Sequence, residues 1–435
     1  MNNKLQKFYW YMYDWANSAY TTSVITVFLG PFLTSIALNS ADINGFVNIF
    51  GIEIYASSLF AYMISLSVIF QFVFMPIIGA IADKLGNNKL LLGVFTYIGV
   101  LATIAMFFID DKGYALGAVL LIISNVCFGI SIVLYNSYLS YISDLEDRDK
   151  TSSIGWAVGY LGAAIYLALN LFFVQNAEKY NFSTGDAVRI CLMGAGIWWA
   201  VFSLIPLIGL KSLKKNTKFH YSHILSSFKE IKHTLISIKK HKVTFNFFIA
   251  YLLYNDGVQA VIALAAVYGS QELKLGNEVL IKAILLVQFV AFVGSLLFNF
   301  LSQKFGNKNS LILSIFIWII AIFYAYQWLY TENDFYLLSI IIGLVLGGTQ
   351  AISRSVFSQL IPTGKEAEYF SFYELTDRGT SWFGTLLFGL SLQFTQSYRL
   401  AILSLLLFFI MGVIVLIKTN INKGIEEITT LNNSN

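Results

Sequence analysis

Charged residues and cysteines are scarce in this sequence, and both shortages limit what the protein can be. Only 12% of the 435 residues are Asp, Glu, Lys or Arg, whereas a soluble protein of this size carries about 25%. The shortage argues against a soluble protein and predicts an integral membrane protein. The two cysteines, Cys127 and Cys191, both fall inside apolar runs, so the sequence predicts neither a disulfide framework nor a cysteine metal site.

Two kinds of motif are missing as well. The sequence has no Gly-x-x-x-x-Gly-Lys-Ser/Thr loop to bind ATP, which excludes a fused ATPase within this chain. No small-residue cleavage site follows the first apolar run, so we expect a retained helix there rather than a signal peptide. We further expect no enzymatic activity, no cofactor, no bound metal and no nucleic-acid partner.

Long apolar runs are what the sequence has in excess, since 57% of its residues are hydrophobic and its mean hydropathy is +0.69. Backbone groups in hydrocarbon must be paired internally, so a membrane-spanning chain forms helices or a closed barrel. The runs are about 20 residues or longer and do not alternate with polar residues, which favours helices. We predict twelve spans with the approximate limits 8–34, 55–82, 90–109, 114–143, 151–175, 188–210, 243–270, 279–303, 309–330, 335–361, 367–392 and 397–418.

A short pattern recurs in the two halves of the sequence. The stretch KLGN at 84–87, after the second predicted span, matches KFGN at 304–307, after the eighth. Parallel repeats of six spans with the substrate between them are one known transporter architecture. We therefore predict an all-α membrane protein built from two pseudo-symmetric bundles of six helices.

The predicted bundles comprise residues 1–210 and 243–420, with a cytoplasmic tail at 421–435. Residues 211–242 form a basic cytoplasmic loop in this prediction. A zinc site is one alternative for the loop, but no cysteine or carboxylate cluster completes a ligand set, so we favour an interfacial helix. The loop contains all four histidines of the chain: His220, His223, His233 and His241.

Lysine and arginine are distributed unevenly between the predicted loops. With a cytoplasmic N-terminus, the inside segments hold about twenty of these residues and the outside segments about six. This excess places both termini in the cytoplasm, as an even number of spans requires. We expect a monomer in a lipid bilayer, namely the inner (plasma) membrane of a bacterial cell.

The first apolar run carries polar residues well inside the membrane. Asp14, Asn17, Ser18 and Thr21 are spaced at i, i+3, i+4 and i+7, so they share one face of a helix. A carboxylate on a membrane helix costs several kcal/mol unless it faces water, a partner charge or a cargo. The pattern therefore predicts that this face lines a transport pathway.

Further charges lie at membrane depth, at about 1.5 Å of rise per residue from the cytoplasmic end. Each of two predicted layers holds one cation and two carboxylates, so one acid per layer needs a cargo or a proton as its partner. A proton is therefore the candidate coupling ion. The shallow layer comprises Asp14, Arg354 and Glu374, and the deep layer comprises Asp256, Asp377 and Arg378.

Simpler roles remain open for several of these residues. Glu374 and Arg378 stand at i, i+4 and could neutralise each other, and Asp14 and Asp256 could belong to structural pairs. We favour a cavity role for both aspartates because they occupy repeat-related helices. Arg354 is the best candidate to anchor a cargo carboxylate, since its planar fork binds carboxylates through two parallel bonds. Gln259 and Gln350 share helix faces with these charges and complete the predicted substrate or coupling site.

The stretch GAIADKLGNNK at 79–89 resembles the Gly-x-x-x-Asp-Lys/Arg-x-Gly-Arg/Lys-Lys/Arg signature of the major facilitator superfamily. It departs from that signature at two asparagines, where basic residues are usual. The resemblance implies a twelve-helix transporter whose spans 1, 4, 7 and 10 line the cavity. It also implies a gating motif of Gly79, Asp83, Lys84 and Gly86, with Asp83 against the positive N-terminal end of span 11.

A narrower resemblance covers nearly the whole chain. The stretches YDWANSAY (13–20), YNDGVQ (254–259) and GGTQAISRSVFSQLIPTGKEAEYFSFYEL (347–375) are similar to the branch that includes the fungal vacuolar amino-acid effluxers linked to autophagy and their bacterial relatives. This resemblance implies an amino-acid-type cargo. The superfamily's arginine in span 4 is absent from SNVCFGISIVLYNSYLSYIS (124–143), so no coupling role can be carried over to it.

Several small and aromatic residues accompany the charged ones. Gly155, Gly159 and Gly162 on span 5 are predicted to allow close helix packing. Four aromatic or amide residues could line the cavity, although membrane aromatics mostly serve packing or anchoring. These four are Tyr135, Asn136, Trp156 and Tyr160.

We therefore predict a secondary active transporter that works by alternating access. Its leading cargo is a small polar solute, best matched by an amino acid and moved by efflux, because a zwitterion suits a cavity with both signs of charge. The alternatives are an exporter of drugs, sugars or lipid-type molecules with the same fold, and a membrane receptor that does not transport.

Overall fold

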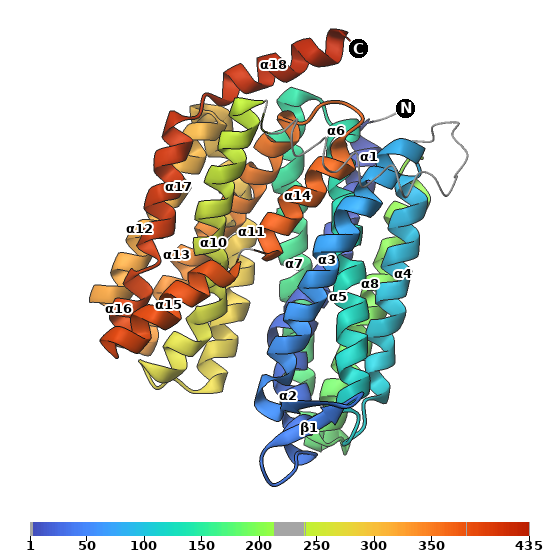
Figure 1. Cartoon of the computed structure of the whole chain (residues 1–435), viewed down its shortest axis with the longest axis vertical. Helices are drawn as coiled ribbons and strands as arrows, with labels where there is room; N and C mark the ends of the chain where they lie inside the picture. Colours follow the sequence, from blue (N-terminus) through green and yellow to red (C-terminus); the bar gives the residue numbers. More distant parts are fainter. Residues whose placement is uncertain (1–2, 213–238, 240, 380, 435) are drawn as a thin grey trace.

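The computed structural model describes residues 3–212, 239, 241–379 and 381–434. Within these ranges, eleven helices are long and apolar enough to cross a membrane. They form two groups side by side, and both chain termini lie at the same end (Figure 1). We call that end the terminal side. We call the opposite end, where a β-hairpin lies, the hairpin side.

The N-terminal half is the blue-to-green group of Figure 1. Its helices are α1 (Asn3–Ala19), α2 (Leu29–Asn39), α3 (Leu59–Leu85), α4 (Asn88–Ala105), α5 (Tyr114–Ser137), α6 (Leu139–Ile142), α7 (Arg148–Gln175) and α8 (Thr184–Gly209). The C-terminal half is the yellow-to-red group. Its helices are α10 (Lys242–Gln271), α11 (Asn277–Phe305), α12 (Asn307–Gln327), α13 (Glu332–Gln359), α14 (Glu366–Gly379), α15 (Ser381–Thr395), α16 (Tyr398–Leu403), α17 (Leu406–Lys418) and α18 (Ile421–Ser434).

The first span is not the uninterrupted α-helix that the sequence predicts at 8–34. A nine-residue π-helix, η1 (Tyr20–Phe28), separates α1 from α2. The Thr26 hydroxyl donates to the Thr21 carbonyl, five residues earlier, as the wider turn allows. Segments of π-helix are rare and often mark functional sites.

A short β-hairpin, which hydropathy does not predict, connects α2 to α3. Strands β1 (Phe46–Ile49) and β2 (Ile52–Tyr55) pair in antiparallel register, with Ile49 opposite Ile52. The two turn residues, Phe50 and Gly51, have φ angles of 50° and 87°. A two-residue turn with both angles positive matches the right-handed twist of a hairpin.

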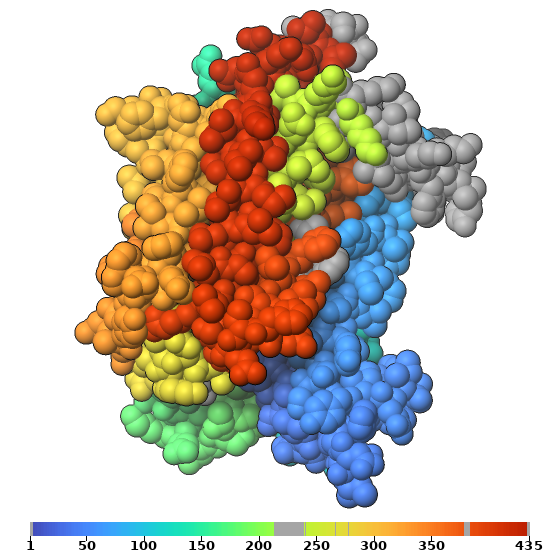
Figure 2. All heavy atoms as spheres, turned by 60° about the vertical axis from the view of Figure 1, so that its left-hand side comes forward, coloured from blue at the N-terminus to red at the C-terminus, as the bar shows by residue number. Residues whose placement is uncertain are grey.

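The described part of the predicted eleventh span, 367–392, falls within α14 and α15. α14 carries acidic residues in its first turn, Glu366 and Glu368, and the described side chains of α15 from Phe383 to Thr395 are largely apolar. The predicted tail at 421–435 contains α18, which crosses the terminal side of the C-terminal half (Figure 2). Its residues Ile421 and Ile428 are buried there.

The predicted loop at 211–242 lies mostly outside the described residues, and so do three of its four histidines. Among the residues that are described, no group of three or more His, Cys, Asp or Glu side chains could hold a metal ion.

One buried apolar cluster extends across both halves. It includes Trp10 and Tyr135 from the N-terminal half and Phe357 and Tyr373 from the C-terminal half. Figure 2 shows the seam where the orange-red helices of the C-terminal half meet the blue helices of the N-terminal half. This shared cluster brings polar side chains from opposite halves into contact.

Candidate functional site

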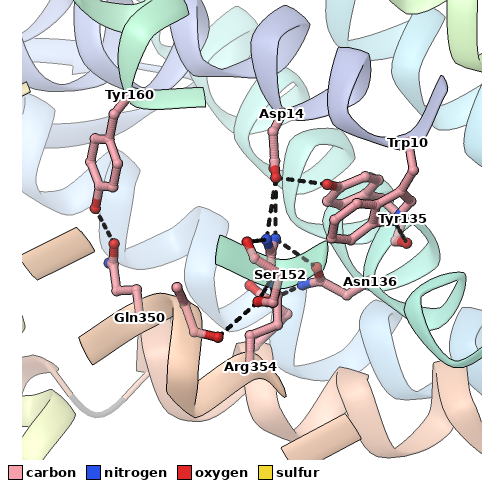
Figure 3. A network of polar contacts seen from close by, with 10 residues as sticks. Trp10, Asp14, Tyr135, Asn136, Ser152, Tyr160, Gln350 and Arg354 are labelled. Atoms are coloured by element: carbon pink, nitrogen blue, oxygen red, sulfur yellow. Dashed lines mark hydrogen bonds and ion pairs between the residues drawn. The ribbon is translucent and has the colours of Figure 1, made fainter. Parts of the chain in front are cut away.

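An ion pair joins the two halves inside the protein (Figure 3). Arg354 of α13 places Nη1 and Nη2 each 3.3 Å from Oδ2 of Asp14 on α1. The Tyr135 hydroxyl of α5 donates to the same oxygen at 2.7 Å. Asp14 is 8% exposed and Arg354 is 2% exposed, so each charge depends on the other for its compensation.

The remaining donors of Arg354 are also occupied by the N-terminal half. Nε donates to Ser152 Oγ at 3.0 Å, Nη2 to the Ser152 carbonyl at 2.8 Å, and Nη1 to Asn136 Oδ1 at 3.3 Å. Asn136 Nδ2 in turn donates to Glu374 Oε1 at 2.7 Å. The three charges of the predicted shallow layer, Asp14, Arg354 and Glu374, therefore belong to one hydrogen-bonded network.

Aromatic rings surround the guanidinium of Arg354. Its Cζ lies 4.8 Å from the ring centre of Trp10, 5.0 Å from that of Trp156 and 5.9 Å from that of Tyr135. A cation over a desolvated aromatic face is stabilised by about 2 kcal/mol or more. Fully bonded and enclosed in this way, Arg354 has no donor left for a cargo carboxylate in this conformation.

Two glycines of α7 make room for the ion pair. A Cβ atom at Gly155 would lie 2.7 Å from Asp14 Oδ2 and 2.9 Å from Arg354 Nη2, and one at Gly159 would lie 3.3 Å from Asp14 Cβ. The sequence predicts a role in helix packing for both glycines. The structure adds a specific reason for Gly155, because a larger residue would displace the charged groups themselves.

The other predicted residues of the first span, Asn17 and Ser18 on α1 and Thr21 on η1, make different contacts. The hydroxyls of Ser18 and Thr21 donate to carbonyls of their own helix segment, at Trp15 and Ser18. Asn17 is buried, and its Nδ2 has no hydrogen-bond partner among the described residues.

Tyr160 and Gln350, which the sequence suggests as cavity residues, form a hydrogen bond between the two halves. The Tyr160 hydroxyl of α7 donates to Oε1 of Gln350 on α13 (Figure 3). Tyr160 also stacks on Trp156, with ring centres 5.6 Å apart. The contact lies deeper in the membrane than the Arg354 network, counted along both helices from the terminal side.

The predicted deep layer is only partly assembled. Asp377 of α14 accepts hydrogen bonds at Oδ1 from Tyr251, Asn255 and Gln259 of α10, at 3.3, 2.9 and 3.0 Å. Asp256 is 1% exposed, and its carboxylate lies beside the backbone of Gly384 with no side-chain hydrogen-bond partner among the described residues. The side chain of Arg378 lies outside the part of the chain that the structure describes.

A cavity of about 670 Å³ lies on the hairpin side of Asp377. It is lined mainly by α10, α11, α12 and α13, with Ile25, Thr26 and Phe60 contributed by the N-terminal half. Gln259 belongs to this lining and also donates to Asp377. The described residues that line the cavity include no Asp, Glu, Lys or Arg.

The predicted gating motif connects α3 to α14. Asp83 accepts hydrogen bonds from the backbone N–H groups of Ala367 at 3.0 Å and Glu368 at 2.8 Å, at the N-terminus of α14. A carboxylate there meets free N–H groups and the positive end of the helix dipole. A Cβ at Gly79 would lie 2.7 Å from the Ala367 carbonyl, so only glycine permits this approach.

The same motif also ends α3. Gly86 caps the helix with a φ of 63°, a left-handed conformation that glycine adopts without strain. Lys84 lies in the last turn before this cap, where the negative end of the helix dipole stabilises a positive charge.

Further contacts between the halves were not identified from the sequence. Asp149 at the start of α7 accepts hydrogen bonds from Ser355, from Gln359 at 3.2 Å and from Asn307 at 3.0 Å. Arg148 donates to the Ser358 carbonyl at 2.7 Å. These partners lie more than 150 residues apart, so no local sequence pattern links them.

A family model described as "Vacuole effluxer Atg22 like" matches residues 2–429. The chain is 30% identical over 410 residues to YxiO of Bacillus subtilis, described as an uncharacterized MFS-type transporter, and the match covers 94% of this chain and 93% of that protein. It is 27% identical over 489 residues to Autophagy-related protein 22 of Vanderwaltozyma polyspora, covering 97% of this chain and 92% of the relative.

Solved transporter structures share the fold. The proton:xylose symporter XylE aligns with a TM-score of 0.69 at 12% identity, covering 96% of this chain and 94% of its own. The major facilitator superfamily transporter FucP aligns with a TM-score of 0.66 at 15% identity, covering 96% and 98%. These likenesses confirm the predicted major facilitator fold.

Proposed function

Because the chain belongs to the family of Atg22-like vacuole effluxers within the major facilitator superfamily, we propose that it moves a small polar solute, best matched by an amino acid, by alternating access. It is a multi-pass membrane transporter and not an enzyme. The proposed site comprises Asp14, Asn17, Asp256, Gln259, Gln350, Arg354, Glu374, Asp377 and Arg378.

The observation that carries this proposal is the buried pair between Asp14 and Arg354. Its two residues come from opposite halves and lie in the terminal-side part of the membrane helices. The cavity lies farther toward the hairpin side. The lysine and arginine distribution supports a cytoplasmic terminal side. The structure then corresponds to a state that is closed toward the cytoplasm.

Alternating access requires this closure to open. Removing one partner of a buried ion pair costs about 3–5 kcal/mol, because the other charge is left uncompensated. A solute carboxylate that takes over Arg354, or a proton that neutralises Asp14, would lower this cost. In this proposal the gating motif of Gly79, Asp83, Lys84 and Gly86 helps to hold the closed state.

Counterflow in proteoliposomes tests the proposal, with radiolabelled phenylalanine, glutamate and lysine as probes. We expect counterflow of at least one probe, and its loss in the variants Asp14→Asn and Arg354→Ala. Glu278→Gln is the matched control, because Glu278 is exposed and pairs with Lys282 at the start of α11. All variants must elute as the wild type does in size-exclusion chromatography. Unchanged counterflow in both site variants would refute the proposed site. Absence of counterflow for every amino acid would refute the proposed cargo.

The apolar lining of the cavity favours a second candidate, an exporter of lipophilic solutes. This candidate predicts that apolar dyes are transported and that amino acids do not compete with them. Competition by amino acids would favour the first proposal.

A further inference from the structure

Asp377 is held by hydrogen bonds at one of its two carboxylate oxygens. Its three partners, Tyr251, Asn255 and Gln259, are neutral donors and all bind Oδ1. Among the described residues, none donates to Oδ2 and no cation pairs with the carboxylate. Asp377 is half-buried rather than sealed. Neutral donors position the group without cancelling its charge, so it remains attractive to a cation.

The cavity beside Asp377 suits an uncharged body. Its volume of about 670 Å³ falls within the range of about 300–1,000 Å³ that is typical of small-molecule sites. The lining hydroxyls of Tyr268 and Ser339 donate to the carbonyls of Ala325 and Phe335, so they are already satisfied. Gln259 connects the cavity to Asp377, because it contributes to the lining and to the hydrogen bonds of Oδ1.

A second carboxylate, that of Asp256, precedes Gln259 by three residues on α10 but does not line the cavity. Asp256 approaches Gly384, which precedes the lining residue Thr385. Both Asp256 oxygens are buried, with no side-chain hydrogen-bond partner among the described residues. The cation Arg354 is held by Asp14 and does not line the cavity. The carboxylate that the described contacts link to the cavity, through Gln259, is therefore that of Asp377.

We propose that the cavity binds the protonated amine and the apolar side chain of the transported solute. The ammonium group binds Oδ2 of Asp377, and the body of the solute packs against the aliphatic and aromatic lining. This inference rests on the proposed transport function and deepens it. It means that the solute is recognised from the hairpin side by its amine, and that a carboxylate on the solute is not needed for binding.

Binding to the full-length protein in detergent tests the inference, measured by isothermal titration calorimetry with three probes of one side chain. Phenylalaninamide keeps the amine and lacks the carboxylate, N-acetylphenylalanine does the reverse, and phenylalanine has both. We expect phenylalaninamide to bind at least as tightly as phenylalanine, and N-acetylphenylalanine not to bind.

Two variants separate the amine subsite from the apolar body. Asp377→Asn is expected to weaken binding of phenylalaninamide by about ten- to a hundredfold, the loss of a hydrogen bond to a charged group, and Asp377→Glu to restore part of it. Ala283→Phe fills the cavity and should weaken binding of phenylalaninamide but not of glycinamide, which lacks the ring. Glu278→Gln is again the matched control and should bind as the wild type does.

The inference would be overturned if N-acetylphenylalanine bound as tightly as phenylalaninamide. It would also be overturned if Asp377→Asn bound phenylalaninamide with the affinity of the wild type, or if the wild type bound none of the probes. If Asp377→Asn does not fold, binding of the three probes to the wild type and to Ala283→Phe still tests the inference. Counterflow of glutamate or of N-acetylated amino acids, together with failed amine binding, would keep the transport function and remove only the amine subsite.

Discussion

Replacing Gly155 with alanine should open the terminal side without removing any charged group. The added Cβ would lie 2.7 Å from Asp14 Oδ2 and from a ring carbon of Trp10, and 2.9 Å from Arg354 Nη2. Asp14 and Trp10 belong to the same half as Gly155, so that part of the clash can persist in every state. The clash with Arg354 exists only while the two halves are in contact.

The expected size of this effect follows from the geometry. Ordinary carbon contacts begin at about 3.5 Å, so the guanidinium must move away from hydrogen bonds that are already 3.3 Å long. Overpacking of this kind costs about 1–3 kcal/mol. If the cost falls on the closed state, the ratio of closed to open molecules drops by about 5- to 150-fold.

Distance measurements between two spin labels would show the change. The labels go on the exposed terminal-side residues Glu146 and Asn309, which lie in opposite halves, after Cys127 and Cys191 have been replaced by serine. Double electron–electron resonance should give a longer distance for Gly155→Ala than for the parent protein.

Gly93→Ala is the matched control for this experiment. A Cβ at Gly93 meets only Leu207, at 3.5 Å and beyond, so it should leave the label distances unchanged. An unchanged distance distribution in Gly155→Ala would refute the reasoning that the Asp14–Arg354 pair holds the terminal side closed. A shift of equal size in Gly93→Ala would refute it too, because the effect would then not come from the ion pair.

Three further predictions concern the surrounding contacts. Asp83→Ala should reduce counterflow more than Asp83→Asn, because asparagine keeps one acceptor for the N-terminus of α14; equal activities would argue against this contact. Tyr160→Phe should raise the solute KM about two- to tenfold, by loss of the hydrogen bond to Gln350, and leave the melting temperature unchanged. Gly86→Ala should lower the melting temperature in detergent, since a left-handed residue with a Cβ costs about 1–2 kcal/mol; an unchanged melting temperature would contradict this expectation.

Hydropathy and charge predict the membrane fold well, because a long apolar run has few alternatives to a membrane helix. One element departs from that prediction for a physical reason. The π-helix at Tyr20–Phe28 depends on hydrogen-bond geometry that leaves no hydropathy signal. The polar residues of α14 within the predicted eleventh span are accommodated by contacts with α3 and α10.

The candidate site could be outlined from the sequence but not completed. Asp14, Arg354 and Glu374 stand out because ionisable groups at membrane depth are costly. Ser152 and Trp10 carry no such signal, since a serine carbonyl and a tryptophan ring look like ordinary membrane residues until a guanidinium is found beside them. The exclusion of Arg354 from the cavity could not be foreseen either, because it depends on which partner occupies the guanidinium in this conformation.

A reversible cross-link between the halves tests the central claim most directly. Asp149 and Ser355 contact each other across the terminal side, so cysteines at both positions can be joined by a short reducible linker in a background without Cys127 and Cys191. We predict that cross-linking stops counterflow, that reduction restores it, and that the unlinked double variant transports. Counterflow that continues at an undiminished rate while the halves are linked would contradict alternating access in this protein.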